Sequence, residues 1–413
     1  MKIRLFLLSL TVLLLSAVGC RREVKIIKQY DRQLPPGQFA LRKITDPAMI
    51  PNIKFACYEL YRLRDSIDRS LSYLSKPSSQ RFFPCDDITH AQAVASLKSL
   101  GELLDQGLIG RKLEQAVRDR FDFYQSVGCD DMGTVLFTGY YTPIFDGSLK
   151  QTDKFKYPLY KQPDDLVKGQ DGQILGRKLA DGQVVPYPAR REIEESRMLA
   201  GKELIWLADP FEVYIAQVQG SAKIRLPDSS LVTVGYAANN GHEYKSIGQE
   251  MIRDNIMAGQ GLSLKAMIDY FKANPGKVNQ YVYRNPRFVF FQTDQGDPRG
   301  SLNEPVTELR TIATDKSIYP RACIAFMTTK LPRLTAGQQV EKRPYMGFSL
   351  DQDTGGAIRA PGRCDVYLGT GDLAGRMAGQ VYEEGKLYYL FLKPELMQKS
   401  SDQSPASAVP DAI

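Results

Sequence analysis

The stretch "DQDTGGAIRAPGRCDVYLGTGD", from Asp351 to Asp372, gathers four aspartates and five glycines without a histidine or a glutamate. Glycine allows sharp turns and lets a backbone approach a ligand closely. Burial raises the pKa of an aspartate, because desolvation disfavours the charged form, and such a group can donate a proton near neutral pH and then act as a base. Aspartates in glycine-rich turns are also ordinary turn residues, so the stretch alone leaves both interpretations open.

The whole chain has the composition of a globular protein. Its 413 residues are enough for two domains with a sizeable core, and 43% of them are apolar and 24% charged. The net charge of +7 is modest, and the Lys and Arg residues are scattered without a long basic run or a nucleic-acid motif. This charge suits an anionic envelope polymer but does not identify one.

The N-terminus is typical of an exported, lipid-anchored protein. A basic start precedes an apolar run from Leu5 to Val18, which is too short to span a bilayer and ends in "SAVGC" at Cys20. This pattern resembles a bacterial lipoprotein signal, with residues 1–19 removed and Cys20 lipidated; an ordinary signal peptide with an incidental cysteine is the alternative. Positions 21 and 22 are arginine rather than the aspartate that holds such lipoproteins at the inner membrane, so we expect the periplasmic face of the outer membrane.

Five cysteines follow Cys20, and an odd number leaves at least one thiol free. An oxidising compartment permits disulfides, and a Cys323–Cys364 bond and buried free thiols are equally compatible with the sequence. There is no CxxC and there are only two histidines, so the sequence does not indicate a zinc site.

The front of the chain has a helical pattern. Residues 20–52 are rich in proline and are expected to form an extended tether, and residues 53–75 carry apolar side chains at helical spacing. Thr89 and Gln92 fit a capping box, and two apolar stripes follow. We therefore expect helices to about residue 128. The stripes comprise Val94, Leu97, Leu100 and Leu104, and then Leu113, Val117, Phe121 and Tyr124.

The remainder reads as short strands separated by Gly, Pro, Asn or Asp, which favours barrels or sandwiches. In "FEVYIAQVQGSAKIRL", Val213 and Ile215 alternate with their neighbours as a half-buried strand requires. Helices are expected after Ser246 and after Ser263, and the low-complexity tail is expected to be disordered. The other expected strands are "TVLFTGYYTP", "SLVTVGYAA", "RFVFFQ", "CIAFMTT" and "KLYYLFLK".

Three other chemistries are disfavoured. "GTGDLAG" lacks the Lys-Ser/Thr of a P-loop, so a turn beside a strand is the better interpretation. His90 and His242 stand without a G-x-S-x-G elbow, which argues against a serine hydrolase. Glu192 and Glu194 offer the two carboxyls of a glycosidase, but acids near a helix N-terminus ordinarily complement the helix dipole.

Eight ordered blocks over roughly residues 130 to 393 resemble the membrane-bound lytic murein transglycosylase A family. The resemblance implies a mainly β fold with a helical N-terminal part. Residues 53–150 and 285–395 would form a double-psi β-barrel domain with N-terminal helices, residues 151–284 an inserted second β-barrel domain with a glycan groove between them, and residues 396–413 the tail. The blocks are "FTGYYTP", "YPLY", "YPARREIE", "VQGSAKIRLPD", "YAANNGHEYKSIG", "NPRFVFF", "TDKSIYPR" and "DTGGAI...CDVYLGTG".

The same resemblance implies cleavage of the β-1,4 bond between N-acetylmuramic acid and N-acetylglucosamine in peptidoglycan, without water and without a cofactor. The muramyl C6 hydroxyl attacks its own C1 and leaves a 1,6-anhydro end. Matched block by block, the family's three aspartates fall on Asp365, the catalytic acid and base, and on Asp353 and Asp315. An intramolecular attack needs no second carboxylate to position a water, because the nucleophile is already tethered. Asp351 and Asp372 receive no role, and turn or surface positions suffice for them.

Candidate substrate contacts come from "TGYYTP" and "VQGS". Tyr140 or Tyr141 could stack on a sugar face, although a tyrosine beside a strand is as often part of the core. Gln217 and Gln219 share strand parity, so both would face the groove or both would face solvent. Lys245 could meet a peptide-stem carboxylate or remain a solvated lysine. The full candidate set is Thr138, Gly139, Tyr140, Tyr141, Thr142, Gln217, Gln219 and Ser221.

Two other functions stay open. A hydrolytic muramidase would need a second carboxylate near Asp365 and would produce reducing ends. A non-catalytic peptidoglycan-binding lipoprotein would bind glycan without turnover. The expected partners are glycan strands, the membrane through a lipid at Cys20 and complexes of cell-wall synthesis or hydrolysis; no nucleic acid is expected.

Overall fold

A computed structural model describes residues 28–401, apart from 171, 259–262, 295 and 336–338. The expected signal peptide and Cys20 lie outside the described residues. None of the helices described in this range is long and apolar enough to cross a membrane.

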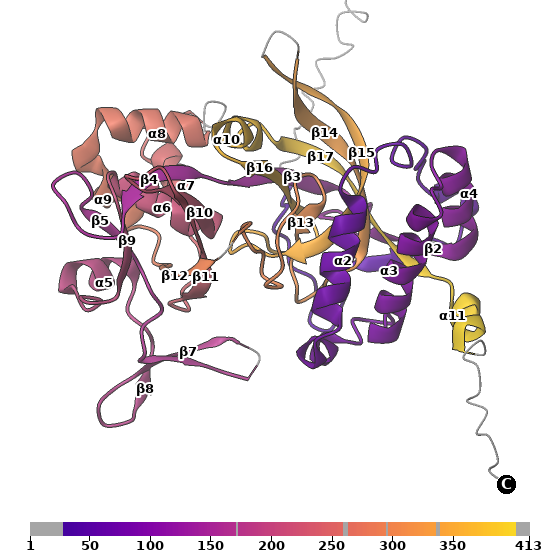
Figure 1. Cartoon of the computed structure of the whole chain (residues 1–413), viewed down its shortest axis with the longest axis horizontal. Coiled ribbons are helices and arrows are strands. Elements are labelled where there is room, and N and C mark those ends of the chain that lie inside the picture. The colour runs from indigo at the N-terminus through magenta and orange to yellow at the C-terminus, as the bar shows by residue number, and fades with distance from the viewer. Residues whose placement is uncertain (1–27, 171, 259–262, 295, 336–338, 402–413) are drawn as a thin grey trace, which may run out of the picture.

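The larger sheet closes on itself, and this closure confirms the mainly β fold with a barrel. Six strands run in the order β17-β14-β15-β13-β16-β3, and β3 pairs back with β17, which removes the exposed edges (Figure 1). Strands β1 and β2 extend the sheet beyond β17. The strands are β1 (Leu41–Lys43), β2 (Phe121–Ser126), β3 (Val135–Thr142), β13 (Thr311–Ala313), β14 (Ile324–Leu334), β15 (Val340–Asp353), β16 (Arg363–Thr370) and β17 (Tyr382–Leu392).

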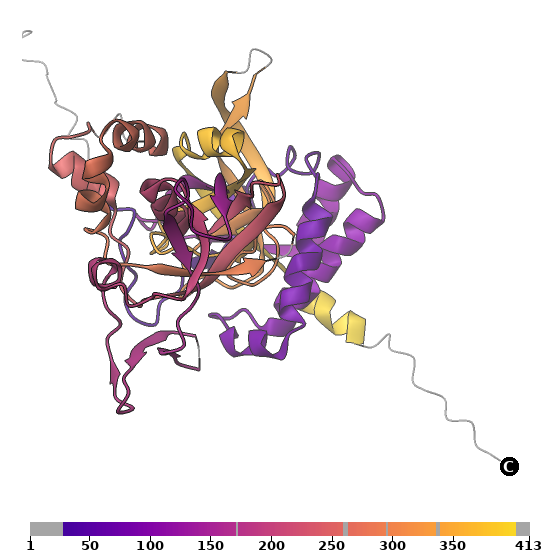
Figure 2. The same cartoon turned by 60° about the vertical axis from the view of Figure 1, so that its left-hand side comes forward.

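The barrel interior and the N-terminal helices share one hydrophobic core. Phe137, Phe326 and Phe348 are fully buried in a cluster that also contains Leu97 and Leu113 of the helices. Removal of such aromatic and aliphatic surface from water is the main force that holds the helices against the sheet. Figure 2 shows these helices gathered as one violet group on a single side of the strands. They are α2 (Leu63–Leu74), α3 (His90–Asp105) and α4 (Arg111–Arg120).

Two details of the helical part differ from the sequence expectation. Thr89 caps α3 by accepting a hydrogen bond from the backbone N of Gln92, but the Gln92 side chain donates to the carbonyl of Leu392 instead of completing a capping box. The helical part also ends at Arg120 rather than near residue 128. Phe121 and Tyr124 lie in β2, because backbone pairing with β17 replaces the helical hydrogen bonds there.

A second sheet forms the other half of the molecule, on the left in Figure 1. Its six strands run in the order β12-β11-β10-β4-β9-β5, and a bridge between Lys161 and Phe291 links β12 to the end of β5. A small sheet, β6-β7-β8, projects from this half. The strands are β4 (Ile144–Ser148), β5 (Tyr157–Tyr160), β6 (Leu166–Lys168), β7 (Ile174–Lys178), β8 (Val184–Val185), β9 (Glu203–Leu207), β10 (Ser221–Arg225), β11 (Leu231–Asn239) and β12 (Val289–Asp294).

The strand pairing does not follow the expected limits of the insert. Strands β4 and β12 lie outside residues 151–284, yet both are hydrogen-bonded into the second sheet. The helices of this half are α5 (Arg190–Ser196), α6 (Pro210–Gln219), α7 (Ile247–Arg253), α8 (Leu264–Ala273) and α9 (Val278–Val282). Ser246 and Ser263 cap α7 and α8, as the sequence predicts.

The expected strand through Val213 and Ile215 is wrong, because this segment forms helix α6. Asp209 caps the helix by accepting a hydrogen bond from the backbone N of Phe211, and proline occupies the first turn. Gly220 ends it in the left-handed conformation, with φ of 78°, which glycine adopts without strain. The short apparent alternation is outweighed by these start and stop signals.

Both ends of the described chain are more ordered than expected. The tether segment contains β1, and Ala40 is fully buried in the barrel core. The hydroxyl of Tyr30 donates to Glu384 at 2.6 Å, which holds the start of the segment on β17. At the other end, helix α11 (Pro394–Ser401) occupies the first part of the expected disordered tail, and the remaining tail lies outside the described residues.

The cysteines of the folded body are free thiols. Cys57, Cys85, Cys129, Cys323 and Cys364 are all buried and unpaired in the part of the chain that the structure describes. The alternative of a Cys323–Cys364 disulfide is therefore wrong, and the alternative of buried free thiols is confirmed.

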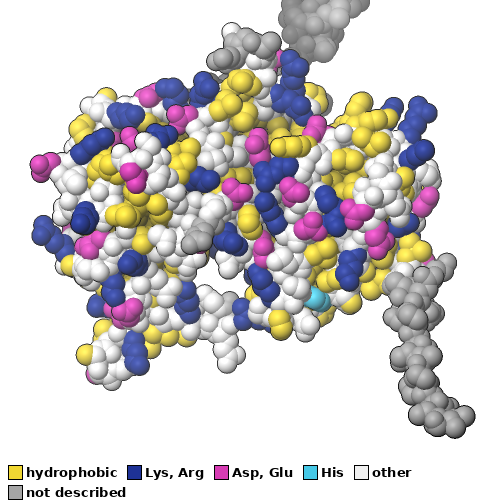
Figure 3. All heavy atoms as spheres, in the orientation of Figure 1, with side chains coloured by type: hydrophobic (Ala, Val, Ile, Leu, Met, Phe, Trp, Pro, Cys, Tyr) yellow, Lys and Arg dark blue, Asp and Glu magenta, His cyan; other side chains and the backbone are white. Residues whose placement is uncertain are grey.

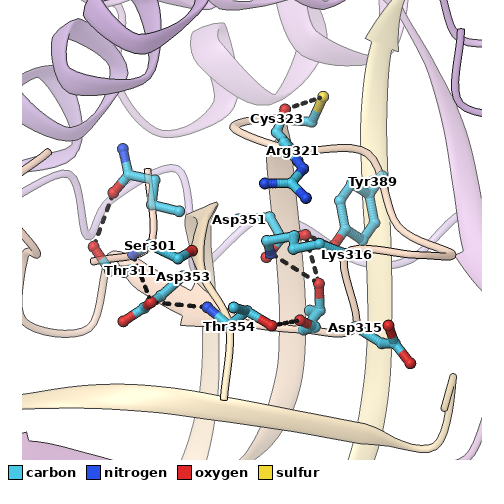
Figure 4. Close-up of polar contacts among 12 residues, drawn as sticks. Ser301, Thr311, Asp315, Lys316, Arg321, Cys323, Asp351, Asp353, Thr354 and Tyr389 are labelled. Carbon is cyan, nitrogen blue, oxygen red and sulfur yellow. Dashed lines mark hydrogen bonds and ion pairs between the residues drawn. The ribbon is translucent and has the colours of Figure 1, made fainter. Parts of the chain in front are cut away.

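Asp351 is a fully buried carboxylate, not the turn or surface residue that the sequence suggested. Its Oδ2 accepts hydrogen bonds of 2.7 Å from Thr314 Oγ1 and from the Tyr389 hydroxyl, and its Oδ1 forms an ion pair with Lys316 (Figure 4). These partners follow β13 or lie in β17, so one carboxylate ties three segments of the barrel together. Asp372, in contrast, is exposed at the start of α10 (Asp372–Ala378).

Substitution of Asp351 with Asn should lower the free energy of unfolding by about 3 to 5 kcal/mol, because it leaves the buried Lys316 charge without its partner. The measurement is urea denaturation of the two proteins at pH 7. Asp372→Asn is the matched control, and its exposed position should limit the loss to about 1 kcal/mol or less. Equal losses for the two variants would contradict the structural role of Asp351.

Candidate active site

A cleft of about 840 Å³ lies between the barrel and the second sheet, and both halves line it. Figure 3 shows the face of the molecule with a hollow between the two halves. The barrel contributes Gly139, Tyr140, Ala313, Lys316, Asp353, Asp365 and Tyr367, and the other half contributes Gln217, Gln219, Ser221, Tyr236, Tyr244 and Arg287, among others.

Two of the predicted aspartates lie in one row across the barrel wall. Ala313 of β13 pairs with Asp353 on one side and with Asp365 on the other, and Asp365 in turn pairs with Thr138 of β3. Neighbouring strands lie about 4.8 Å apart, so the backbones of the two aspartates are separated by roughly 10 Å. The central, short strand β13 therefore sets the spacing of the two carboxyls.

A register shift explains why Asp353 reaches the cleft while Asp351 does not. Between Ile312 and Ala313 the pairing with β15 moves from Asp351 to Asp353 and passes over Gln352. A bulge of this kind re-aims side chains. Asp351 stays in the interior, and Asp353 lines the cleft.

Asp365 differs from the other aspartates of this region in having an oxygen without a hydrogen-bond partner. Its Oδ1 is buried without a hydrogen-bond partner, and so is the neighbouring Oγ1 of Thr138. Burial raises the pKa of Asp365 to about 7; the charge of Arg363 opposes this rise, and the charge of Asp353 adds to it. A carboxylic acid with such a pKa holds its proton near neutral pH and can still release it.

Asp353 is held in place by three donors. Tyr140 donates its hydroxyl hydrogen to Oδ2 at 2.8 Å. The backbone N–H groups of Ser301 and Thr354 donate to Oδ1, each at 2.8 Å (Figure 4). Burial raises the pKa of Asp353, and the hydrogen bond from Tyr140 lowers it. Its oxygens are engaged, so it suits a fixed neighbour better than a second proton carrier.

Asp315 lies beside the cleft rather than in its lining. Its Oδ1 accepts a 2.6 Å hydrogen bond from the Ser317 hydroxyl, and its Oδ2 accepts from the backbone N of Ala360 at 3.0 Å. These bonds join the segment after β13 to the segment before β16. Asp315 therefore braces the two strands that carry Ala313 and Asp365.

The "TGYYTP" residues divide between the cleft and the core. Gly139 and Tyr140 line the cleft, and the Tyr140 ring lies against Tyr367 with 5.2 Å between ring centroids. Tyr141 is buried beside Gly375 of α10 and cannot stack on a ligand in the cleft. Thr142 is also buried, and its hydroxyl is within hydrogen-bonding distance of Tyr367 and Ser221.

The "VQGS" residues all reach the cleft, although they belong to a helix end and not to one strand. Gln217 is only 4% exposed, and neither its Oε1 nor its Nε2 has a hydrogen-bond partner. Gln219 accepts a hydrogen bond from the backbone N of Tyr141 at 3.1 Å, which joins the two halves. Ser221 begins β10. Strand parity was the wrong basis for placing Gln217 and Gln219 together.

Sequence reasoning missed several residues of the cleft. Tyr367 lies two positions after Asp365 in β16, and the two-residue period of a strand could have placed both on one face. Arg287 and Arg359 come from different halves, and no local pattern connects them. Lys245, the candidate for a stem carboxylate, lies 3.6 Å from Glu250 and is not among the residues that line the cleft.

No group of three His, Cys, Asp or Glu side chains within the described part of the chain is arranged to hold a metal ion.

Two family models match the chain. Residues 136–292 match the MltA specific insert domain, and residues 310–391 match the 3D domain. The first covers most of β3 and the second sheet up to the middle of β12, and the second covers the barrel strands from β13 through β16 and nearly all of β17.

Named proteins are similar over most of their length. The membrane-bound lytic murein transglycosylase A of Escherichia coli (strain K12) is 28% identical over 66% of this chain and 70% of the relative. The membrane-bound lytic murein transglycosylase A homolog of Buchnera aphidicola is 30% identical over 63% of this chain and 67% of the relative.

Solved structures share the fold. A membrane-bound lytic murein transglycosylase from Agrobacterium tumefaciens superposes with a TM-score of 0.71 at 24% identity, over 88% of this chain and 99% of that one. E. coli MltA with bound chitohexaose gives a TM-score of 0.63 at 24% identity, over 89% of this chain and 98% of that one.

A barrel and a second β domain thus lie on either side of a cleft that holds a buried carboxyl group. The matches identify the class, since the named relatives are lytic transglycosylases of murein, the bacterial peptidoglycan. The chain belongs to the membrane-bound lytic murein transglycosylase A family.

The raised pKa of Asp365 predicts how stability depends on pH. Between pH 4 and pH 7 the native state keeps a proton that the unfolded chain, with an ordinary pKa of about 3.9, has released. The contribution of Asp365 to stability therefore falls as pH rises through this interval and is constant above it. Asp365→Asn removes this titration.

The melting temperature of Asp365→Asn minus that of the wild type should be small at pH 4, grow towards pH 7 and stay level above pH 7. Differential scanning calorimetry across this range measures it, with the exposed Asp372→Asn as control. A difference that does not change with pH would show that Asp365 titrates normally.

Proposed function

We propose that this enzyme cleaves the β-1,4 bond between N-acetylmuramic acid and N-acetylglucosamine by intramolecular transglycosylation, with Asp365 as acid and then base. The observation that carries the proposal is the Oδ1 of Asp365, which is buried at the cleft without a partner on a carboxyl whose pKa is about 7. An acid in this state is ready to donate a proton when a glycosidic oxygen takes the vacant hydrogen-bonding position.

The reaction needs one proton carrier. Asp365 donates its proton to the glycosidic oxygen as the bond from that oxygen to C1 of the muramyl residue breaks. The C6 hydroxyl of the same residue then forms the new bond to C1 and passes its proton to the Asp365 carboxylate. The enzyme returns to its starting protonation state, no water is consumed, and the product is a 1,6-anhydro end. The tethered nucleophile supplies the effective concentration that a free water lacks.

Asp353 and Asp315 assist without transferring protons. The charge of Asp353 raises the pKa of Asp365, while its three donors hold it in place. Asp315 braces the strand ends through Ser317 and Ala360. This division of roles is supported by the hydrogen bonds of each carboxyl and by the sequence blocks in which they lie.

Substrate contacts come from both halves. We assign hydroxyl and acetamido recognition to Gln217, whose amide has both hydrogen-bonding atoms unused, and to Gln219 and Ser221 beside it. Tyr140 offers a ring at the cleft wall, and its hydroxyl is committed to Asp353. The relative with bound chitohexaose supports an oligosaccharide as the ligand of this cleft.

A hydrolytic muramidase is the second candidate. Inverting enzymes place two carboxyls about 6.5 to 9.5 Å apart with a water between them, and the row from Asp353 to Asp365 has a similar span. The hydrogen bonds on Asp353 disfavour it as the base that activates this water. The mass and the end group of the product distinguish the two mechanisms experimentally.

The proposal extends to the chain's organisation and location. The strand pairing supports an insert from about residue 144 to residue 294, slightly longer than the expected 151–284. Lipidation at Cys20 and the outer membrane rest on the sequence of the N-terminus and on relatives named as membrane-bound. Complexes of cell-wall synthesis or hydrolysis remain candidate partners.

Digestion of purified murein sacculi tests the mechanism. The full chain in detergent should release muropeptides that are one water lighter than hydrolytic products, as measured by mass spectrometry. Asp365→Asn should lose at least about 100-fold in rate, because it removes the acid and base. Asp372→Asn, an exposed carboxyl of the same stretch, is the matched control and should retain the wild-type rate.

Each contrary outcome points to one alternative. Products of full mass with reducing ends would replace transglycosylation by hydrolysis. Binding of sacculi without release of product, by the wild type and by Asp365→Asn alike, would identify a binding protein. Full activity of Asp365→Asn with anhydro products would keep the reaction and reject the residue.

A further inference from the structure

One wall of the cleft is a tight turn that the proposed mechanism does not use. The turn spans residues 299–305, between β12 and β13. A bridge joins Arg299 to Pro305, and the backbone N of Gly300 donates to the carbonyl of Glu304 at 3.0 Å. These contacts give the turn a defined backbone. The residues of the turn that line the cleft are Arg299, Gly300, Ser301 and Asn303.

The rear of the turn is fixed to the N-terminal helical part. Glu304 is buried, and its Oε1 accepts hydrogen bonds from Ser72 Oγ at 2.9 Å and from Lys76 Nζ at 2.6 Å. Arg69 donates from Nη1 to the carbonyl of Pro305 at 3.3 Å. Ser72 and Arg69 belong to α2, so the larger half of the molecule supports the turn from behind.

The front of the turn is docked on Asp353. The backbone N of Ser301 donates to Asp353 Oδ1 at 2.8 Å, and Figure 4 shows this bond and the bond from Thr354 meeting at one oxygen. The hydroxyl of Tyr140, which also lines the cleft, donates to the other oxygen. Asp353 therefore connects two parts of the cleft wall that are distant in the sequence.

This docking depends on Gly300, because a side chain at this position would not fit. An added Cβ would lie 3.0 Å from the carbonyl oxygen of Gln352, 3.1 Å from Asp353 Cγ and 3.1 Å from Val306 Cγ1, closer than most Cβ contacts in proteins. The φ of Gly300 is outside the left-handed region, so alanine could adopt the same backbone conformation. Space, and not backbone conformation, selects glycine here.

Two side chains of the turn are available to a ligand. Ser301 and Asn303 are exposed and line the cleft, and neither side chain has a hydrogen-bond partner among the residues that the structure describes. A hydroxyl and an amide can each donate and accept hydrogen bonds, which matches the hydroxyl and acetamido groups of a sugar. Support at the front and at the rear holds these groups in place before a ligand arrives, which lowers the cost of binding.

We propose that the 299–305 turn is a sugar-binding wall of the cleft, positioned by Gly300 through the hydrogen bond of Ser301 with Asp353. This inference rests on the proposed function, because it assigns substrate contacts in the same cleft. Ser301 and Asn303 bind hydroxyl or acetamido groups of the glycan. Gly300 acts through the turn and is a positioning residue. Asp353 thereby has a second task, since it fixes the binding wall as well as placing a charge beside the catalytic acid.

Binding of chitohexaose tests the wall without turnover. The parent protein is the full chain with Asp365→Asn in detergent, and isothermal titration calorimetry gives the dissociation constant. Asn303→Gly removes the amide and keeps the φ of 58°, so it should weaken binding about fivefold. Asn255→Gly is the matched control, because Asn255 has the same φ and is exposed away from the cleft lining. Equal effects of the two variants, or no binding by the parent, would overturn the wall.

Gly300→Ala tests the positioning role in the same assay. It should weaken binding about tenfold, because the added methyl group moves the turn away from Asp353 and misplaces its side chains. Gly276→Ala is the matched control, since Gly276 is exposed, has a φ outside the left-handed region and has no atom within 4 Å of an added Cβ. An unchanged dissociation constant in Gly300→Ala, or an equal loss in Gly276→Ala, would overturn the role.

A double-mutant cycle separates positioning from a general loss of stability. Asp353→Ala removes the acceptor of the Ser301 N–H, so Gly300→Ala should change binding less than about twofold in that background. Two effects that multiply would contradict a role through Asp353. Glu304→Ala releases the rear of the turn from outside the cleft lining and should weaken binding about threefold. It decides the test if Gly300→Ala fails to fold, and an unchanged dissociation constant would then overturn the proposal.

The outcome is separable from that of the proposed reaction. Failure of the wild type to release anhydro products from sacculi rejects the transglycosylase mechanism and leaves the binding comparison readable. Anhydro products formed by Gly300→Ala with undiminished kcat/KM, in place of the expected tenfold loss, reject the positioning role and leave the reaction intact.

Discussion

The buried carboxylate of Asp351 is the interaction on which the barrel and its site depend. It joins Lys316 and Thr314, which follow β13, to Tyr389 of β17, and it is itself part of β15. A buried charge without its partner is strongly destabilising, so these segments have one arrangement in which all groups are satisfied. That arrangement fixes β13, the strand that separates the two carboxyls of the cleft. A residue without a catalytic role thereby sets the geometry in which catalysis becomes feasible.

Four aspartates lie close together in this region, and their partners give them different chemistry. Asp351 is neutralised by an ion pair, Asp315 is bound to a hydroxyl and to backbone N–H groups, and Asp353 accepts three hydrogen bonds. Asp365 alone among them keeps a buried oxygen without a partner. Environment, more than residue type, therefore gives these four carboxyl groups different properties.

The cleft exists because two halves of the chain meet, and each supplies what the other lacks. The barrel provides the Asp365 carboxyl and the rings of Tyr140 and Tyr367. The other half provides the unpaired amide of Gln217 and the guanidinium of Arg287. Contacts such as Gln219 with the backbone of Tyr141 fix their relative position. The buried polar atoms of Gln217 and Asp365 that lack hydrogen-bond partners cost stability, which is typical of functional sites.

The sequence by itself determined the fold class, the order of most strands and the family, because alternating side chains and ordered motif blocks are local features. It also indicated the three candidate aspartates. It misassigned α6, where a short alternation masked the stronger signals of Asp209, Pro210 and Gly220. Only the tertiary structure decided that Asp351 is buried, that Tyr141 faces the core and that Arg287 meets the loop of Arg359. These properties depend on partners distant in the chain, such as Tyr389, which lies 38 residues from Asp351, and no local pattern contains that information.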